Sequence, residues 1–220
     1  MSTLQGKLNW LFDEYINKKL TKEEYINEID SLASERPDEV KKEFGYRIDN
    51  RSLAEFASHM LEQMEIERDI IEHWITTFGQ YFGDAKFEYS GIYDEARLIC
   101  ESSTTKEQMK KPDIIIDNGK IQYLEIKQCP CLHKATYKTA DLKHYNSLGN
   151  VYMLTAHTKG KFSKDKVSFY TILSPDGLAN VLEDGRRGIL KSEKRREMGY
   201  KKAVQFDISG MKKYFEIQEI

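Results

Sequence analysis

The stretch from Pro112 to Lys127, PDIIIDNGKIQYLEIK, constrains the fold of this chain more than any other segment. Two apolar runs, Ile114–Ile116 and Tyr123–Ile126, flank an Asn118-Gly119 pair. β-branched and aromatic residues favour strands, and Asn-Gly between two such runs is a strong local signal for a hairpin. The sequence therefore predicts two short strands joined by a tight connection.

Three charged residues lie where buried strands usually carry none: Asp113 at the start of the first strand, and Glu125 and Lys127 near the end of the second. Side chains two positions apart on a strand share a face, so Glu125 and Lys127 point the same way. Carboxylates hold hard cations through oxygen, and a lysine beside them can orient or activate an attacking water. These residues predict metal-assisted phosphodiester hydrolysis. The alternative is an edge hairpin whose charges face solvent.

Pro112-Asp113, eleven intervening residues and Glu125-Ile126-Lys127 resemble the motif of the PD-(D/E)xK nuclease superfamily. That superfamily includes type II restriction endonucleases, Holliday-junction resolvases and RecB-type nucleases. The resemblance implies that Asp113 and Glu125 are metal ligands and that Lys127 is the catalytic lysine. It also implies Mg²⁺ as cofactor, with Mn²⁺ as a substitute, and double-stranded DNA as partner. The implied α/β fold is restriction-endonuclease-like, with a mixed central sheet flanked by helices.

The length of the hairpin loop tests this assignment. A two-residue turn would pair Asp113 with Leu124 and place Asp113 and Glu125 on opposite faces of the sheet. A three-residue loop over Asp117–Gly119, with its glycine in the left-handed conformation, would pair Asp113 with Tyr123 instead. Asp113 and Glu125 would then be diagonal neighbours on one face, about 7–8 Å apart. A shared metal site requires the second arrangement.

Residues 1–48 are expected to form an N-terminal helical segment, and residues 49–220 the nuclease domain. Apolar residues recur at helical spacing from Leu4 to Ile16, and Thr21-Lys22-Glu23-Glu24 matches a capping box that opens a second helix. This segment could simply cover the core, or it could contact DNA or form a homodimer. Its acidic character favours the first role.

A long helix is expected from about Arg51 to Phe82, with Asn50 or Ser52 as its cap and with one broad apolar stripe. Glu67 lies within that stripe, where an ionised carboxylate costs several kcal/mol unless it is paired or binds a metal. In many enzymes that share the motif, the helix before the sheet supplies an acidic residue to the metal site. Glu67 is therefore a candidate third metal ligand, and a structural salt bridge is the alternative.

Charge is unevenly distributed along the chain. Residues 1–120 carry 16 basic and 25 acidic side chains, whereas residues 121–220 carry 18 basic and 11 acidic ones. A polyanion would therefore be attracted to the second half. The densest basic run lies near its end, and its candidate DNA contacts are Arg186, Arg187, Lys191, Lys194, Arg195 and Arg196. A solvated helix face is the alternative for such a run.

A helix expected from His133 to Leu148 would present Lys134, Lys138 and Tyr145 on one face as further candidate phosphate contacts. Asp141 and Tyr145 also resemble, in place and spacing, a Gln and Tyr pair of RecB-like nucleases, although Asp stands where those enzymes have Gln. The basic loop Lys159–Lys164 is another place where DNA could be contacted.

Cysteine usage and hydropathy bound the remaining possibilities. Cys129, Cys131 and His133 could ligate zinc, or with Cys100 an iron–sulfur cluster, but such sites usually present two separated cysteine pairs. Three cysteines without framework spacing are typical of reduced thiols, so we expect a cytoplasmic protein. No apolar run approaches the length of a membrane span, and no signal-peptide pattern opens the chain.

The sequence thus predicts a magnesium-dependent DNA endonuclease, most like a type II restriction enzyme. A junction resolvase, a phage or homing-type nuclease, and a nucleic-acid-binding module without catalysis are the alternatives.

Overall fold

The computed structural model describes residues 3–45, 51–98, 111–187, 192–194 and 202–220. Internal contacts divide the chain into two compact units, the first formed by Met1–Ile66 and Ser90–Lys111, and the second by Glu67–Tyr89 and Pro112–Ile220. The long helix α4 (Leu53–Phe78) contributes residues to both. The expected division into residues 1–48 and 49–220 stays a prediction.

The first unit is helical, as the periodicity of its apolar residues predicts. It contains α1 (Leu4–Ile16), α2 (Lys22–Glu35), α3 (Pro37–Phe44), the start of α4, and α5 (Gly91–Ala96). Thr21 and Glu24 form the expected capping box at the start of α2. Its core is built from the buried side chains of Leu4, Leu8, Leu11, Phe12, Tyr25, Ile29, Leu32 and Phe44.

The chain turns after α5 at Arg97 and Leu98. Arg97 donates a hydrogen bond to Asp13 of α1, at 3.0 Å, which holds the turn against the helices.

The second unit is built on a mixed six-stranded sheet, which confirms the predicted α/β class. Its strand order is β1-β2-β3-β5-β6-β9, and every neighbouring pair is antiparallel except β3 and β5. The strands are β1 (Lys86–Tyr89), β2 (Ile114–Asp117), β3 (Ile121–Cys129), β5 (Val151–Thr158), β6 (Val167–Leu173) and β9 (Glu216–Glu219). A 3-10 turn, η1 (Lys164–Lys166), precedes β6.

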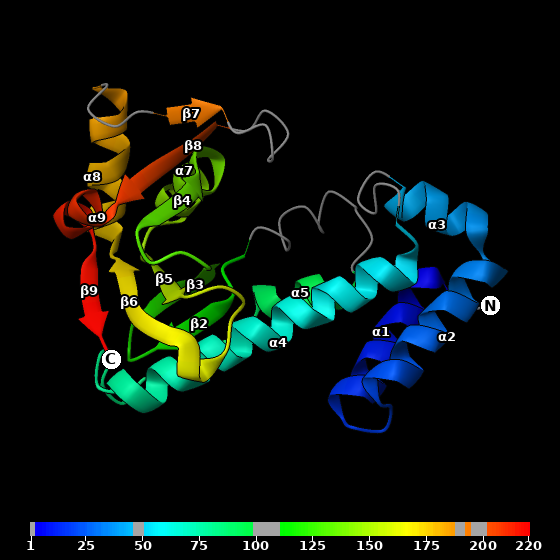
Figure 1. Cartoon of the computed structure of the whole chain (residues 1–220). Helices are drawn as coiled ribbons and strands as arrows, with labels where there is room; N and C mark the ends of the chain where they lie inside the picture. The colour runs from blue at the N-terminus through cyan, green and yellow to red at the C-terminus, as the bar shows by residue number, and fades with distance from the viewer. Residues whose placement is uncertain (1–2, 46–50, 99–110, 188–191, 195–201) are drawn as a thin grey trace. The chain divides into compact units, whose positions relative to one another are not determined.

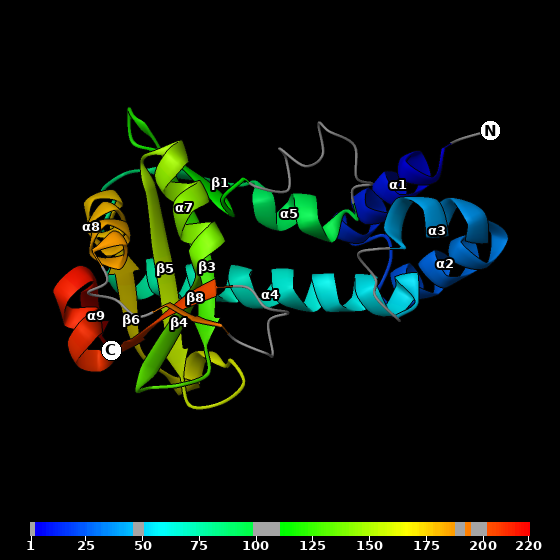
Figure 2. The same ribbon diagram turned by 90° about the horizontal axis from the view of Figure 1, so that it is seen from above.

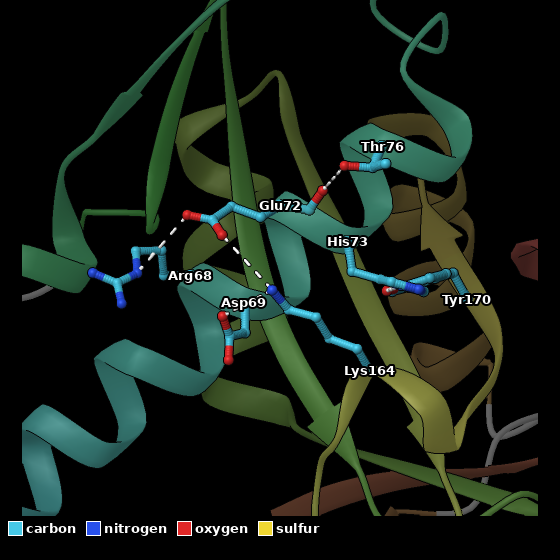
Figure 3. A network of polar contacts seen from close by, with 7 residues as sticks. All are labelled: Arg68, Asp69, Glu72, His73, Thr76, Lys164 and Tyr170. Carbon is cyan, nitrogen blue, oxygen red and sulfur yellow. Dashed lines mark hydrogen bonds and ion pairs between the residues drawn. The ribbon is translucent and has the colours of Figure 1, made fainter.

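Both faces of this sheet are covered. In Figures 1 and 2, α4 crosses one face, and α7 (Thr139–Leu148), α8 (Pro175–Arg186) and α9 (Ile208–Tyr214) lie on the other. Trp74 of α4 donates its indole N–H to Gln218 of β9 at 2.8 Å. His73 Nδ1 lies 2.7 Å from the hydroxyl of Tyr170 on β6 (Figure 3). These bonds fix the second half of α4 against the sheet.

The helix α4 begins at a sequence-encoded cap. The Ser52 hydroxyl accepts from the Glu55 N–H at 3.1 Å, and the Glu55 carboxylate accepts from the Ser52 N–H at 2.7 Å. This reciprocal pair confirms Ser52 as one of the two expected caps. Among the helices that the structure describes, none is long and apolar enough to cross a membrane.

A second, three-stranded sheet with the order β4-β8-β7 lies over the α7 face, and it corrects one prediction. Its strands are β4 (Lys134–Lys138), β8 (Lys202–Asp207) and β7 (Ser192–Lys194). Residues 134–138 therefore form a strand rather than the first turns of a helix. Ala135 and Tyr137 alternate with more exposed neighbours and pair with Phe206 and Val204 of β8. The distant strand β8 satisfies the backbone here.

Candidate active site

The hairpin that carries the acidic motif has a three-residue loop. Ile114 pairs with Leu124 and Asp117 with Ile121, so the loop is Asn118–Lys120, one residue later than expected. Gly119 adopts a positive φ of 89°, and its N–H donates to the side chain of Asp117 at 3.0 Å. This bond stabilises the turn while Asp117 stays in the ladder.

This register decides which residues face one another. Continued by one residue beyond Ile114, it sets Asp113 directly opposite Glu125 on the same face of the sheet. The same-face arrangement is therefore confirmed, although Asp113 opposes Glu125 rather than Tyr123. In the parallel ladder Glu125 pairs with Met153 and Lys127 with Thr155, which places both on the face covered by α7.

The two carboxylates are buried at this point. Asp113 is 6% exposed and Glu125 is 3% exposed. Oδ2 of Asp113 accepts a hydrogen bond from the backbone N–H of Ile126, at 2.7 Å. The ammonium of Lys127 contacts Oε1 of Glu125. The structure thus brings Asp113, Glu125 and Lys127 together, as the sequence predicted.

Glu67 belongs to the same electrostatic neighbourhood. It is 7% exposed on α4. Burial raises the pKa of Asp113 well above its usual range, and the nearby carboxylates of Glu125 and Glu67 raise it further. Three acidic side chains therefore share one buried region, which is unfavourable unless positive charge is supplied.

Lys127 supplies one such charge. Burial by itself would lower the pKa of Lys127, but the carboxylates of Glu125 and Asp113 outweigh burial, and the net pKa is raised. The side chain is therefore an ammonium at neutral pH. It can orient and stabilise an attacking hydroxide or a phosphate oxygen, but it cannot remove a proton from water in this state.

Tyr145 also lies at this site, in a different setting from the one predicted. It comes from α7, and its hydroxyl hydrogen-bonds Glu125. Burial raises the pKa of this hydroxyl, and the charge of Glu125 raises it further, so it stays a donor. The predicted common helix face of Tyr145 with Lys134 and Lys138 does not exist, because those two residues lie on β4.

The donor set fits a hard divalent cation. Asp113 and Glu125 offer carboxylate oxygens, which Mg²⁺ prefers, and Mg²⁺ commonly takes one or two carboxylates and completes its shell with water and substrate phosphate. The local excess of negative charge favours a cation in the same place. Within the described residues, no group of three or more His, Cys, Asp or Glu side chains is arranged to hold a metal. Glu67 as a third ligand stays a prediction.

Cys129 is a free thiol at the end of β3, Cys131 is a free thiol two residues later, and His133 is exposed. The thiol of Cys129 donates to the carbonyl of Lys134 at 3.0 Å, and burial raises its pKa. Cys100 lies outside the described residues, so the iron–sulfur alternative is not tested.

The predicted DNA contacts are scattered. Lys134 and Lys138 lie on β4, where buried Ala135 and Tyr137 alternate with more exposed residues. Arg186 lines a cavity of about 360 Å³ together with Lys143 of α7. Arg187 is paired with Glu183 one turn earlier in α8. Lys191, Arg195, Arg196 and the side chain of Lys194 lie outside the described part of the chain.

The basic loop before β6 is tied to α4 rather than free. Lys164 Nζ lies 3.2 Å from Asp69 Oδ1 and 3.9 Å from Glu72 Oε2 (Figure 3). Arg68 Nε lies 3.9 Å from Glu72 Oε1, and the Thr76 hydroxyl donates a hydrogen bond to the backbone carbonyl of Glu72 at 2.8 Å. Lys164 thus helps to fix this loop on α4, which makes it a weak candidate for DNA contact.

Comparisons with known proteins give little guidance. No protein-family model matches the chain, and no curated protein matches its sequence. Among solved structures, Archaeoglobus fulgidus Hjc, a Holliday junction resolvase from an archaeal hyperthermophile, is similar over 50% of this chain and 70% of its own. The sequence identity is 13% and the TM-score is 0.29. A likeness this weak decides neither fold nor activity.

Proposed function

We propose that this chain is a divalent-metal-dependent DNA endonuclease of the PD-(D/E)xK type. The observation that supports it is the meeting of Asp113, Glu125 and Lys127 on one face of the sheet, with both carboxylates buried. An edge hairpin with solvent-facing charges would not bury two carboxylates. Glu67 and Tyr145 add a third acidic group and a hydroxyl donor at the same place.

Each side chain has a role that follows from its environment. Asp113 and Glu125 would hold Mg²⁺, or Mn²⁺ in its place, and the Ile126 N–H keeps the Asp113 carboxylate oriented. The ion supplies Lewis-acid polarisation of the phosphate and a lower pKa for bound water. The Lys127 ammonium positions the attacking oxygen. The hydroxyl of Tyr145 holds Glu125 in place.

The substrate we propose is DNA, because the second half of the chain is basic and Lys134 and Arg186 are exposed. Site-specific cleavage of a duplex, as the resemblance to restriction enzymes implies, is one form of this activity. Cleavage of a four-way junction is another. Cleavage assays on plasmid, linear duplex, four-way junction and single-stranded DNA, each with Mg²⁺ or with a chelator, separate these forms.

The decisive experiment is cleavage by conservative variants of the site. Asp113→Asn, Glu125→Gln and Lys127→Ala should each reduce cleavage by about 10²-fold or more, because each removes charge stabilisation at the reacting phosphate. The two carboxylate variants should also weaken metal binding. DNA affinity without metal should largely survive, since phosphate contacts elsewhere dominate it.

Matched controls lie close by: Glu88 is on β1, Asp117 ends β2, and Lys120 lies in the loop between β2 and β3. Asp117→Asn, Glu88→Gln and Lys120→Ala remove the same charges at exposed positions and should leave cleavage within about twofold. Cleavage at the wild-type rate by Glu125→Gln would remove the ligand assignment. DNA binding without any metal-dependent cleavage by the wild-type chain would show a binding module instead.

A further inference from the structure

A cavity of about 310 Å³ adjoins Lys127 near the end of β3. Its lining includes Thr155 of β5, Tyr137 and Thr136 of β4, and Gln205 of β8. Lys127 and Thr155 are paired in the β3–β5 ladder, so the cavity lies on the same face as Glu125. It therefore extends from the candidate active site toward the second sheet.

Two of the lining residues, Tyr137 and Thr155, belong to a buried hydroxyl network. The hydroxyls of Tyr137 and Thr155 lie 2.8 Å apart, and Tyr137 also bonds Thr171. Nε2 of His157 lies 3.0 Å from the Thr171 hydroxyl. Burial raises the pKa of Tyr137 to about 12, so its hydroxyl keeps its proton at neutral pH. Polar groups held this way are fixed in direction and offer defined donors and acceptors.

The walls add groups suited to the edge of a base. Gln205 carries both an amide donor and a carbonyl acceptor, and its Nε2 lies 3.5 Å from the Thr136 hydroxyl. The exposed Lys134 lines the cavity and can meet a phosphate. A nucleotide matches both features, because the edge of its base carries hydrogen-bond donors and acceptors and its phosphate is an anion.

The position of the cavity beside the candidate active site indicates which part of a DNA substrate it would bind. A phosphate bound at Asp113, Glu125 and Lys127 would place an adjoining nucleotide of the same strand beside Lys127. A base within an intact duplex cannot enter a cavity without leaving its stack, which costs a few kcal/mol, and an unpaired base avoids most of that cost. The volume lies at the small end of ligand sites, which suits one nucleotide.

We propose that this cavity binds an unpaired nucleotide next to the scissile phosphate. The inference rests on the proposed nuclease function and names its substrate class: DNA with an unpaired or extruded nucleotide at the cut, as in bulges, branch points or single strands. Thr155, Gln205 and Thr136 are specificity residues in this scheme, since they contact the base and not the reacting atoms.

The direct test places the fluorescent base 2-aminopurine at successive positions around the cut in a bulged duplex, with Ca²⁺ in place of Mg²⁺. Binding of the full chain should change its fluorescence at one position only. Gln205→Ala should weaken that change, and Thr155→Val, which keeps the shape but removes a hydroxyl, should do the same. Gln122→Ala, a glutamine at the far end of β3, is the matched control and should leave the change intact.

Cleavage kinetics give an independent measure. Wild-type kcat/KM should be at least about tenfold higher for a one-nucleotide bulge than for the matched duplex. Gln205→Ala should lower kcat/KM on the bulge by about 2- to 10-fold, the effect of one lost hydrogen bond. With an abasic nucleotide at that position, Gln205→Ala and wild type should become equal.

The outcomes separate this inference from the nuclease proposal. A position-specific fluorescence change that Gln205→Ala weakens supports the cavity even if no cleavage occurs. Cleavage of matched and bulged DNA at equal rates, or equal behaviour of Gln205→Ala and Gln122→Ala, overturns the cavity while leaving the nuclease intact. Gln205 lies half-exposed on β8, so its variant is informative even where Thr155→Val fails to fold.

Discussion

Asp113 is bound to the strand that carries Glu125: its Oδ2 accepts the backbone N–H of Ile126, with 2.7 Å between oxygen and nitrogen. The bond holds the first carboxylate opposite the second and favours its charged form. Burial and the charges of Glu125 and Glu67 favour the neutral form, and they prevail, so the pKa is raised. Without a cation, the repulsion between these buried carboxylates destabilises the folded protein.

Replacing Asp113 by Asn should therefore stabilise the metal-free protein at neutral pH while abolishing cleavage. Asn keeps an oxygen for the Ile126 N–H and removes the charge. The gain in the free energy of unfolding should be roughly 0.5–2 kcal/mol at pH 7.5. Because the pKa of Asp113 is raised in the folded protein, its ionisation lowers the free energy of unfolding as the pH rises. The gain from the Asn variant should therefore shrink as the pH is lowered toward 4. Urea unfolding at both pH values measures it, and a less stable variant at pH 7.5 would contradict the electrostatic account.

Replacing Glu67 by Gln tests its part in the site. The amide keeps the shape of a buried side chain and removes its charge, so folding should be unaffected or slightly improved. Turnover should fall by about 10- to 100-fold if the charge helps to hold the cation. Metal-dependent cleavage assays measure this, with Asp69→Asn, an acidic residue paired with Lys164 on the same helix, as control. An unchanged rate for Glu67→Gln would make Glu67 a structural residue.

Replacing Tyr145 by Phe removes the hydroxyl that bonds Glu125 and leaves the ring in the core beneath α7. We expect kcat to fall by about tenfold with little change in DNA affinity, because Glu125 loses a group that orients it. Single-turnover cleavage and binding in Ca²⁺ separate the two effects. Tyr152→Phe, on the opposite face of the sheet, should cleave normally. Equal rates for the two variants would leave Tyr145 with a packing role only.

Acid should destabilise this fold through His157. Burial lowers its pKa to about 4, below the ordinary value of 6.5, and its ring stacks on Phe169. The unfolded chain therefore binds a proton between these values and the folded chain does not, so the free energy of unfolding falls as pH drops from 6.5 to 4. The loss should be up to about 3 kcal/mol. His157→Gln should flatten this part of the stability profile, whereas His133→Gln at an exposed position should not. Parallel profiles for wild type and His157→Gln would contradict the assignment.

The sequence by itself determined the features that depend on near neighbours. The caps at Thr21 and Ser52, the Asn118-Gly119 turn, and the pairing of Glu125 with Lys127 on one face all follow from residues a few positions apart. The helical periodicity also placed Glu67 on a buried face before any neighbour was known. These features are local because one turn of helix or one hairpin satisfies its own hydrogen bonds.

Only the tertiary structure decided which distant segments meet. Residues 134–138 carry a pattern that a helix also tolerates, and β8, far along the chain, makes them a strand by completing their ladder. The same pairing helps to form the cavity beside Lys127, which no sequence motif predicts. Tyr145 reaches Glu125 because α7 packs over that face of the sheet. Strand partners and converging side chains depend on how the whole chain buries its apolar surface, and local sequence does not specify that.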